Sequence, residues 1–257
     1  HIVAWPGKSS VDEILNIGGE KLPIGSFSVL SNALPNDYPA IKDKRAGIQD
    51  MGSQLIAEIF FATRRDEATK WLDLCAGPGG KAALLHNLLV AEKPSDSFLA
   101  NEPTEHRADL VARVVPRGKV ISYDGRDFES FGEKFDRILI DAPCSGLGAL
   151  RRRPEARWRR SLNDLKELLP LQRDLIDSAY EMLNPGGIIG FATCSPLLAE
   201  TKSQVLDAKY RHKDLKILDI AKFSPAGSTG VNPDGSLQLW THLDASDSMF
   251  MALLQKS

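Results

Sequence analysis

The chain has 257 residues, of which 42% are hydrophobic and 26% are charged, and its formal net charge is -2. This balance is ordinary for a globular protein, and the length suits one large α/β domain, alone or with a smaller piece. No apolar run approaches the roughly 18 residues of a membrane-spanning helix, so we expect no membrane partner.

Residues 1–45 are rich in proline and glycine and are predicted to form a small flap or subdomain, with strand-like stretches such as 27–30. Residues 50–63 keep one apolar face, and Asp50 is the expected N-cap of a helix there. After residue 70 the pattern alternates between strand and helix. Strands are predicted at 71–74, 97–100, 119–122, 135–141, 188–193, 215–219 and 248–254, and helices at 80–91, 104–115, 162–183 and 198–208.

This alternation predicts an α/β fold with a mainly parallel, seven-stranded sheet and right-handed crossovers. We expect two domains, an N-terminal flap over residues 1–45 and the α/β domain over 46–257. In open α/β sheets, ligands bind beyond the carboxyl ends of the strands. The residues that follow each strand are therefore the candidate site residues.

A glycine-rich turn follows the first strand of the sheet, and it runs over residues 75–81. Its glycines would let backbone amides approach a ligand at the N-terminus of the next helix. The spacing matches neither the dinucleotide fingerprint nor the phosphate loop, and a tight turn that only packs helix on sheet is the alternative. Glu102 ends the second strand, where an acidic residue can bind ribose hydroxyls, and Asp124 follows the third. A solvated Glu102 and a turn-capping Asp124 are the alternatives.

Two cysteines follow strands of this sheet. Cys144 lies in Asp-Ala-Pro-Cys-Ser after the fourth strand, and Cys194 lies in Thr-Cys-Ser after the fifth. One cysteine at a strand end is usually a small buried hydrophobe, but two beside one glycine loop indicate chemistry. The chain has three cysteines, no Cys-x-x-Cys pair and scattered histidines, so we expect reduced thiols, a cytoplasmic location and no metal site.

Six arginines lie within residues 151–160, together with Trp158. Arginines beside an aromatic ring suit phosphates and unstacked bases. The alternative is an exposed helix whose charges are merely solvated.

The motifs together resemble the RsmB/Sun family of RNA cytosine-5 methyltransferases. The resemblance covers about residues 45–254 and rests on Gly47-Ile-Gln-Asp50 with Ser53, Leu72-Asp-Leu-Cys-Ala-Gly-Pro-Gly-Gly-Lys81, Asp141-Ala-Pro-Cys-Ser-Gly-Leu-Gly148, Arg151-Arg-Arg-Pro-Glu-Ala-Arg-Trp158, and Ala192-Thr-Cys-Ser-Pro196 followed by Glu200. It implies a Rossmann-like class I S-adenosylmethionine-dependent methyltransferase fold, S-adenosylmethionine as cofactor, and RNA, above all 16S rRNA, as substrate. The chain starts at His1, and we expect it to be a monomeric fragment of a longer protein.

The resemblance also implies roles for residues. Cys194 would add to carbon-6 of cytosine, Cys144 would assist release of the covalent product, Asp141 would hydrogen-bond the base, and Lys81 would help hold thiolate charge. Spacing alone does not rank the two cysteines, and analogy with DNA cytosine methyltransferases would favour Cys144. The implied cofactor-binding residues are Cys75, Ala76, Gly77, Pro78, Gly79, Gly80, Lys81, Glu102, Arg107, Asp124 and Asp141, and the RNA-binding residues are Arg151, Arg152, Arg153, Arg157 and Trp158.

Three other functions compete with this one. Transfer RNA is the alternative substrate. A non-catalytic RNA-binding assembly factor is disfavoured by the presence of both cysteines, Asp141 and Lys81. A nicotinamide oxidoreductase is disfavoured because the chain lacks Gly-x-Gly-x-x-Gly after its first strand.

Overall fold

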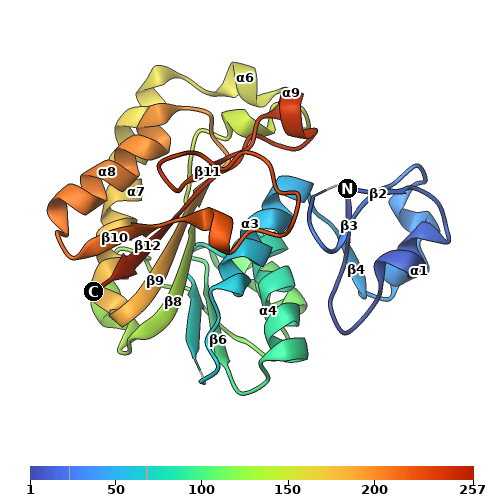
Figure 1. Cartoon of the computed structure of the whole chain (residues 1–257), viewed down its shortest axis with the longest axis horizontal. Coiled ribbons are helices and arrows are strands. Elements are labelled where there is room, and N and C mark those ends of the chain that lie inside the picture. Colours follow the sequence, from blue (N-terminus) through green and yellow to red (C-terminus); the bar gives the residue numbers. More distant parts are fainter. Residues whose placement is uncertain (23, 68) are drawn as a thin grey trace.

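The computed structural model describes residues 1–22, 24–67 and 69–257. A small antiparallel sheet occupies the N-terminal end of the chain (Figure 1). Its order is β2-β3-β1-β4, with β1 at Ile2–Ala4, β2 at Glu20–Lys21, β3 at Ser28–Leu30 and β4 at Ala46–Ile48. The helices α1 (Val11–Leu15) and α2 (Pro39–Lys42) belong to the same part of the chain.

This part of the chain is more regular than the sequence predicts, since only one of its strands is anticipated. The small sheet also reaches Ile48, because β4 pairs with β1 along its whole length. Strand pairing therefore extends beyond the expected boundary at residue 45. The division of the chain into two domains stays a prediction.

The large sheet has the order β10-β12-β9-β8-β5-β6-β7, and a short additional strand, β11 (Leu237–Gln238), pairs with β12. Five neighbouring strands are parallel, and β12 runs antiparallel to both of its neighbours on the main path. The bounds are β5 Lys70–Asp73, β6 Ser97–Asn101, β7 Lys119–Ile121, β8 Phe135–Asp141, β9 Leu183–Thr193, β10 Leu215–Leu218 and β12 Phe250–Lys256. The predicted Rossmann-like α/β fold with a mainly parallel sheet is confirmed.

Helices cover both faces of this sheet (Figure 1). One apolar core joins the sheet to α3 (Met51–Ala62), α4 (Gly80–Glu92) and α5 (Glu105–Val114). A second core joins the opposite face to α7 (Leu162–Met182) and α8 (Lys202–Arg211). Short helical turns fill the connections, namely α6 (Ala156–Arg159), α9 (Thr241–Asp244), η1 (Pro35–Asp37), η2 (Phe128–Phe131), η3 (Leu147–Ala149), η4 (Leu198–Glu200) and η5 (Ile220–Lys222).

Two elements differ from their predicted form. The strand expected from residue 188 begins at Leu183, which pairs with Phe135 across a bulge in β8. The helix expected over 198–208 is split into η4 and α8, because Thr201 leaves the helical region with φ -126° and ψ -106°. Within the described ranges, no helix combines the length and apolar character needed to cross a membrane.

Candidate functional site

The carboxyl ends of four parallel strands bring the predicted site residues together. The glycine loop follows β5, Glu102 follows β6, Asp141 ends β8 and Cys194 follows β9. Because these strands are parallel neighbours in the sheet, their ends open onto one edge. Residues more than 100 positions apart therefore form one site.

The two cysteine thiols form a pair at this edge. The Sγ atoms of Cys144 and Cys194 lie 3.4 Å apart, and neither is in a disulfide. The hydrogen bond with Cys144 lowers the pKa of Cys194, and the Lys81 ammonium acts in the same direction, against burial and the Asp141 charge. The same hydrogen bond, followed by burial, raises the pKa of Cys144 well above the usual thiol value. The pair thus favours a Cys194 thiolate that accepts a hydrogen bond from the Cys144 thiol.

Lys81 and Asp141 form a buried ion pair beside the thiols. The Lys81 ammonium, only 8% exposed, donates to Asp141 Oδ2 over 2.8 Å. Burial lowers the pKa of Lys81, but the charge and hydrogen bond of Asp141 outweigh burial, and the net change is upward. Lys81 therefore stays a cation close to Cys194, as an activated thiolate requires.

The glycine loop lies against a second carboxylate. A Cβ atom on Gly77 would fall 1.9 Å from Glu102 Oε2, so only glycine lets the loop and Glu102 approach this closely. Arg107 donates to the Gly77 carbonyl over 2.7 Å and lies 3.4 Å from Glu102 Oε2. Glu102 Oε1 accepts a hydrogen bond from the Thr104 amide over 3.0 Å. These contacts build a rigid cradle at the N-terminus of α4.

Asp73, beneath this loop, is buried and has no hydrogen-bond partner for either carboxylate oxygen among the described residues. Burial, followed by the charge of Asp141, raises its pKa to about 7. Unpartnered buried polar atoms at a strand end are typical of a site that a polar ligand completes.

Asp124, by contrast, is about half exposed and is held by the Arg126 guanidinium through bonds of 2.6 to 3.2 Å. Arg126 lowers the pKa of Asp124, and the expected contact of Asp124 with the cofactor stays a prediction.

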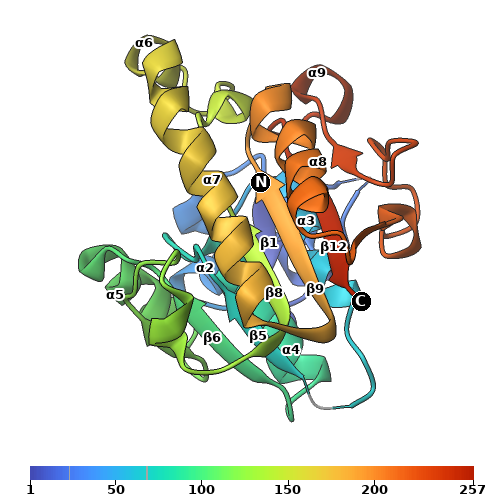
Figure 2. The same cartoon turned by 90° about the vertical axis from the view of Figure 1, so that its left-hand side faces the viewer.

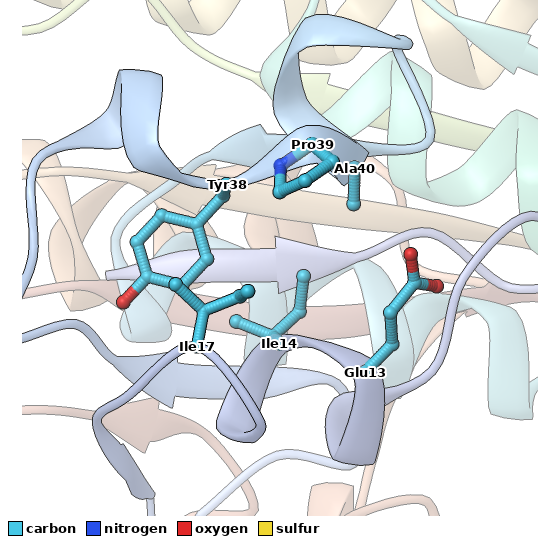
Figure 3. Close-up of a pocket in the computed structure, with 6 residues that line it drawn as sticks. All are labelled: Glu13, Ile14, Ile17, Tyr38, Pro39 and Ala40. Carbon is cyan, nitrogen blue, oxygen red and sulfur yellow. The ribbon is translucent and has the colours of Figure 1, made fainter.

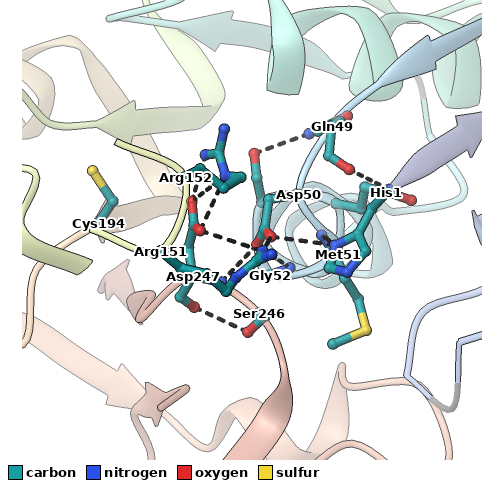
Figure 4. Close-up of polar contacts among 12 residues, drawn as sticks. His1, Gln49, Asp50, Met51, Gly52, Arg151, Arg152, Cys194, Ser246 and Asp247 are labelled. Carbon is teal, nitrogen blue, oxygen red and sulfur yellow. Dashed lines mark hydrogen bonds and ion pairs between the residues drawn. The ribbon is translucent and has the colours of Figure 1, made fainter. Parts of the chain in front are cut away.

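The arginine segment divides into two parts, of which the first is bound within the protein (Figure 4). Arg151 donates to Asp50 Oδ2 over 2.6 Å, and Arg152 binds both carboxylate oxygens of Asp247. Asp50 in turn accepts a hydrogen bond from the Asp247 amide over 2.9 Å. Both carboxylates are buried, so these guanidiniums have internal partners instead of the free positions expected for phosphate ligands.

The second part is exposed. Arg153 and Arg157 face solvent, and the Trp158 side chain on α6 is 84% exposed. Figure 2 shows α6 beyond the end of the sheet toward which β9 points, on the side of the cysteine loops. This exposed segment keeps the features that suit RNA.

Sequence reasoning missed two acidic residues at the site. Asp247 belongs to no motif recognised in the sequence, and it ends an Asp-Ala-Ser-Asp segment three residues before β12. Glu200 belongs to a sequence motif that assigns it no role, yet it is fully buried and accepts hydrogen bonds from the residues that follow both cysteines. An acidic residue six positions after a strand-end cysteine was the available signal.

Two cavities lie away from the thiols. One, of about 60 Å³, lies in the N-terminal part and is lined by Glu13, Ile14, Ile17, Tyr38, Pro39 and Ala40 (Figure 3). Another, of about 290 Å³, lies between the end of α4 and the starts of β6 and β7. In the part of the chain that the structure describes, no cluster of three or more His, Cys, Asp or Glu side chains is arranged for a metal ion.

Comparisons with known proteins show which family the chain resembles. The sequence profile of the family described as 16S rRNA methyltransferase RsmB/F matches residues 59–255. Rv1407 of Mycobacterium tuberculosis, named as a proposed methyltransferase, is 42% identical and covers 100% of this chain and 56% of its own length. The ribosomal RNA small subunit methyltransferase B of Pectobacterium carotovorum is 35% identical and covers 86% of this chain and 49% of its own length. The chain spans about half the length of these relatives.

Solved structures share the fold. PH0851 superposes with a TM-score of 0.86 at 24% identity, over 99% of this chain and 59% of its own. NSun6 from Pyrococcus horikoshii, determined with SFG, superposes with a TM-score of 0.73 at 24% identity, over 88% of this chain and 56% of its own.

Proposed function

The chain belongs to the RsmB/F family of 16S rRNA methyltransferases, and we propose that it uses S-adenosylmethionine to methylate carbon-5 of a cytosine in 16S rRNA. The observation that carries the proposal is the thiol pair, with sulfur atoms 3.4 Å apart, beside the Lys81–Asp141 ion pair. Carbon-5 of cytosine is a poor nucleophile, so its methylation needs covalent activation of the ring. A thiolate held beside a buried ammonium is the group that such activation requires.

The glycine cradle is suited to the cofactor. The loop at Gly77 leaves no room for a side chain, and Glu102 offers a buried carboxylate for ribose hydroxyls. The Asp73 oxygens have no hydrogen-bond partner within the described ranges. Residues 75–81 with Glu102, Arg107 and Asp141 would hold it, and Asp124 would lie near its adenine. When bound, S-adenosylmethionine supplies the methyl group that carbon-5 receives.

Cys194 is the proposed nucleophile. Its thiolate sulfur attacks carbon-6 of the base and forms a carbon–sulfur bond, which makes carbon-5 nucleophilic. Asp141 lies beside the thiol pair and would hydrogen-bond the base, and Lys81 holds Asp141 in position. The Lys81 cation also stabilises the thiolate before attack.

Cys144 is the proposed group for product release. After methyl transfer, the proton on carbon-5 leaves to a base and the Cys194–carbon-6 bond breaks, which returns the thiolate to Cys194. Cys144 is adjacent to this bond, because its sulfur lies 3.4 Å from Cys194 Sγ. The exposed Arg153, Arg157 and Trp158 would contact the RNA backbone and a stacked base outside the pocket.

The test is to incubate the protein with S-adenosylmethionine and 16S rRNA, with transfer RNA as a parallel substrate, and to map 5-methylcytosine by bisulfite sequencing. We expect one or a few protected cytosines in 16S rRNA with the wild-type protein and none with Cys194→Ala. Protection in transfer RNA alone would change the substrate. No protection in either RNA, by a protein that binds the cofactor, would refute the proposal.

A further inference from the structure

A single buried carboxylate connects the loops that carry the two cysteines. Glu200, on η4, is fully buried. It accepts a hydrogen bond from the Ser145 amide over 2.7 Å and from the Ser145 hydroxyl over 2.5 Å. It also accepts one from the Ser195 hydroxyl over 2.6 Å. Ser145 directly follows Cys144, and Ser195 directly follows Cys194.

A residue of α7 completes this connection. The fully buried Gln172 side chain donates to Glu200 Oε1 over 3.3 Å and to the Pro143 carbonyl over 2.8 Å. All four donors around Glu200 are neutral, so among the residues that the structure describes the carboxylate is held by hydrogen bonds and has no ion-pair partner. Such a buried network fixes its members tightly, since each lost bond leaves an unsatisfied group.

We propose that Glu200 is a positioning residue that holds the Cys144 and Cys194 loops in register and so assigns the thiolate to Cys194. The inference rests on the proposed function and deepens it, because it names what makes the two cysteines unequal. Glu200 acts through Ser145 and Ser195. A displacement of about 1 Å between the loops would weaken the Cys144–Cys194 hydrogen bond, since weak sulfur hydrogen bonds fall off steeply with distance.

The charges around Cys194 act in both directions. The hydrogen bond with Cys144 is the main cause of the lowered pKa of Cys194, and Lys81 of α4 adds to it, whereas Asp141 of β8 and Asp247 of the loop before β12 oppose it. Cys194 also contributes to the raised pKa of Arg152. Besides the hydrogen bond with Cys194 and burial, the charge of Glu200 raises the pKa of Cys144. Glu200 therefore disfavours a thiolate at Cys144 by charge and supports the one at Cys194 by geometry.

The test measures the initial rate of iodoacetamide alkylation at each cysteine by peptide mass spectrometry, from pH 5 to pH 10, without RNA. In the wild-type protein we expect Cys194 to become reactive at a lower pH than Cys144. In Glu200→Gln we expect alkylation of Cys194 at pH 7 to slow about 3- to 10-fold and that of Cys144 to rise, so that the two profiles converge. Glu200→Asp keeps the charge but shortens the side chain, and it should slow Cys194 without activating Cys144.

Glu58→Gln is the matched control, because Glu58 is another buried carboxylate that accepts backbone hydrogen bonds, from Ser26 in the N-terminal part. It should leave both thiol profiles unchanged. If Glu200→Gln does not fold, Ser195→Ala removes one hydrogen bond from the same carboxylate and should shift Cys194 in the same direction. Wild-type profiles in the folded variants would overturn the role of Glu200. A wild-type protein that methylates no RNA, but whose profiles converge in Glu200→Gln, would refute the proposed function and leave the role of Glu200 intact.

Discussion

Replacing Gly77 by alanine should damage the cofactor cradle while leaving the fold in place. The added Cβ would meet Glu102 Oε2 at 1.9 Å and its carboxyl carbon at 2.7 Å. A Cβ atom does not approach non-bonded atoms this closely in real structures, so either the loop or the Glu102 side chain must move. Glu102 is the more movable of the two, because its carboxylate ends a flexible side chain, whereas Arg107 holds the loop carbonyl.

The size of the effect follows from the bonds that Glu102 makes. Moving its carboxylate breaks the hydrogen bond from Thr104, which should cost about 1–2 kcal/mol of unfolding free energy. For a chain of this size, such a loss corresponds to a fall in Tm of about 2–8 °C. If Glu102 binds ribose hydroxyls, the cofactor loses about 1–3 kcal/mol of binding free energy, which is a rise in Kd of about 5- to 150-fold.

Calorimetric titration with S-adenosylmethionine and thermal unfolding together provide the assay. Gly118→Ala is the matched control, because its Cβ would meet Phe98 Cδ1 at 3.0 Å at the opposite end of the sheet. We expect the control to lower Tm without changing the Kd of the cofactor. An unchanged Kd in a folded Gly77→Ala protein would refute both the cradle and the role of Glu102.

Three further predictions concern the thiols, Asp73 and RNA. Cys144→Ala should methylate but release slowly and accumulate a protein–RNA adduct on denaturing gels, whereas Cys194→Ala should form none; trapping by Cys194→Ala instead would reverse the assignment. The pKa of Asp73 is raised from 3.8 to about 7, so the folded protein holds a proton that the unfolded chain releases, and stability without cofactor should fall as pH rises from about 4 to 7. Asp73→Asn should therefore raise the free energy of unfolding at pH 8, by up to about 4 kcal/mol, and much less at pH 4. Chemical denaturation measures this change, and an equal change at both pH values would contradict the prediction. Arg153→Ala should weaken RNA binding and reduce the slope of log K against log salt concentration by about 1, whereas Trp158→Ala should weaken binding without changing that slope. Binding titrations at several salt concentrations measure both, and wild-type affinity in either variant would contradict the prediction for that residue.

The large sheet could be predicted because its strands are buried on both faces. The stretch 135–141 contains the apolar run Ile138-Leu139-Ile140, and the observed β8 has the predicted bounds. The small N-terminal sheet could not be predicted, since its strands have only two or three residues. Alternation between two faces cannot be recognised over so short a stretch. Its existence depends on pairing between segments more than 40 residues apart, such as β1 with β4.

The site was predictable to the extent that its residues follow strands. The strand-end rule places Asp141 and Cys194 at the same edge of the sheet, and the structure shows Asp141, Lys81 and both thiols in one group. The rule says nothing of side chains that reach the site from outside the parallel strands. Asp50 and Asp247 are separated by 197 residues, and their pairing with Arg151 and Arg152 appears only in the folded chain.

This pairing changes how the arginine segment should be understood. Removing one partner from a buried ion pair leaves an uncompensated charge, which is costly, so Arg151 and Arg152 are engaged within the protein before any RNA arrives. They anchor the segment that follows Cys144 to the N-terminus of α3 and to the loop before β12. On the other side of the same cysteine, the Gln172 side chain donates to the Pro143 carbonyl over 2.8 Å, and Glu200 accepts from the Ser145 amide next to Cys144. Cys144 thus lies on a segment that is fixed on both sides. Its sulfur is 3.4 Å from that of Cys194, and a fixed segment lets the pKa of Cys144 stay above that of Cys194.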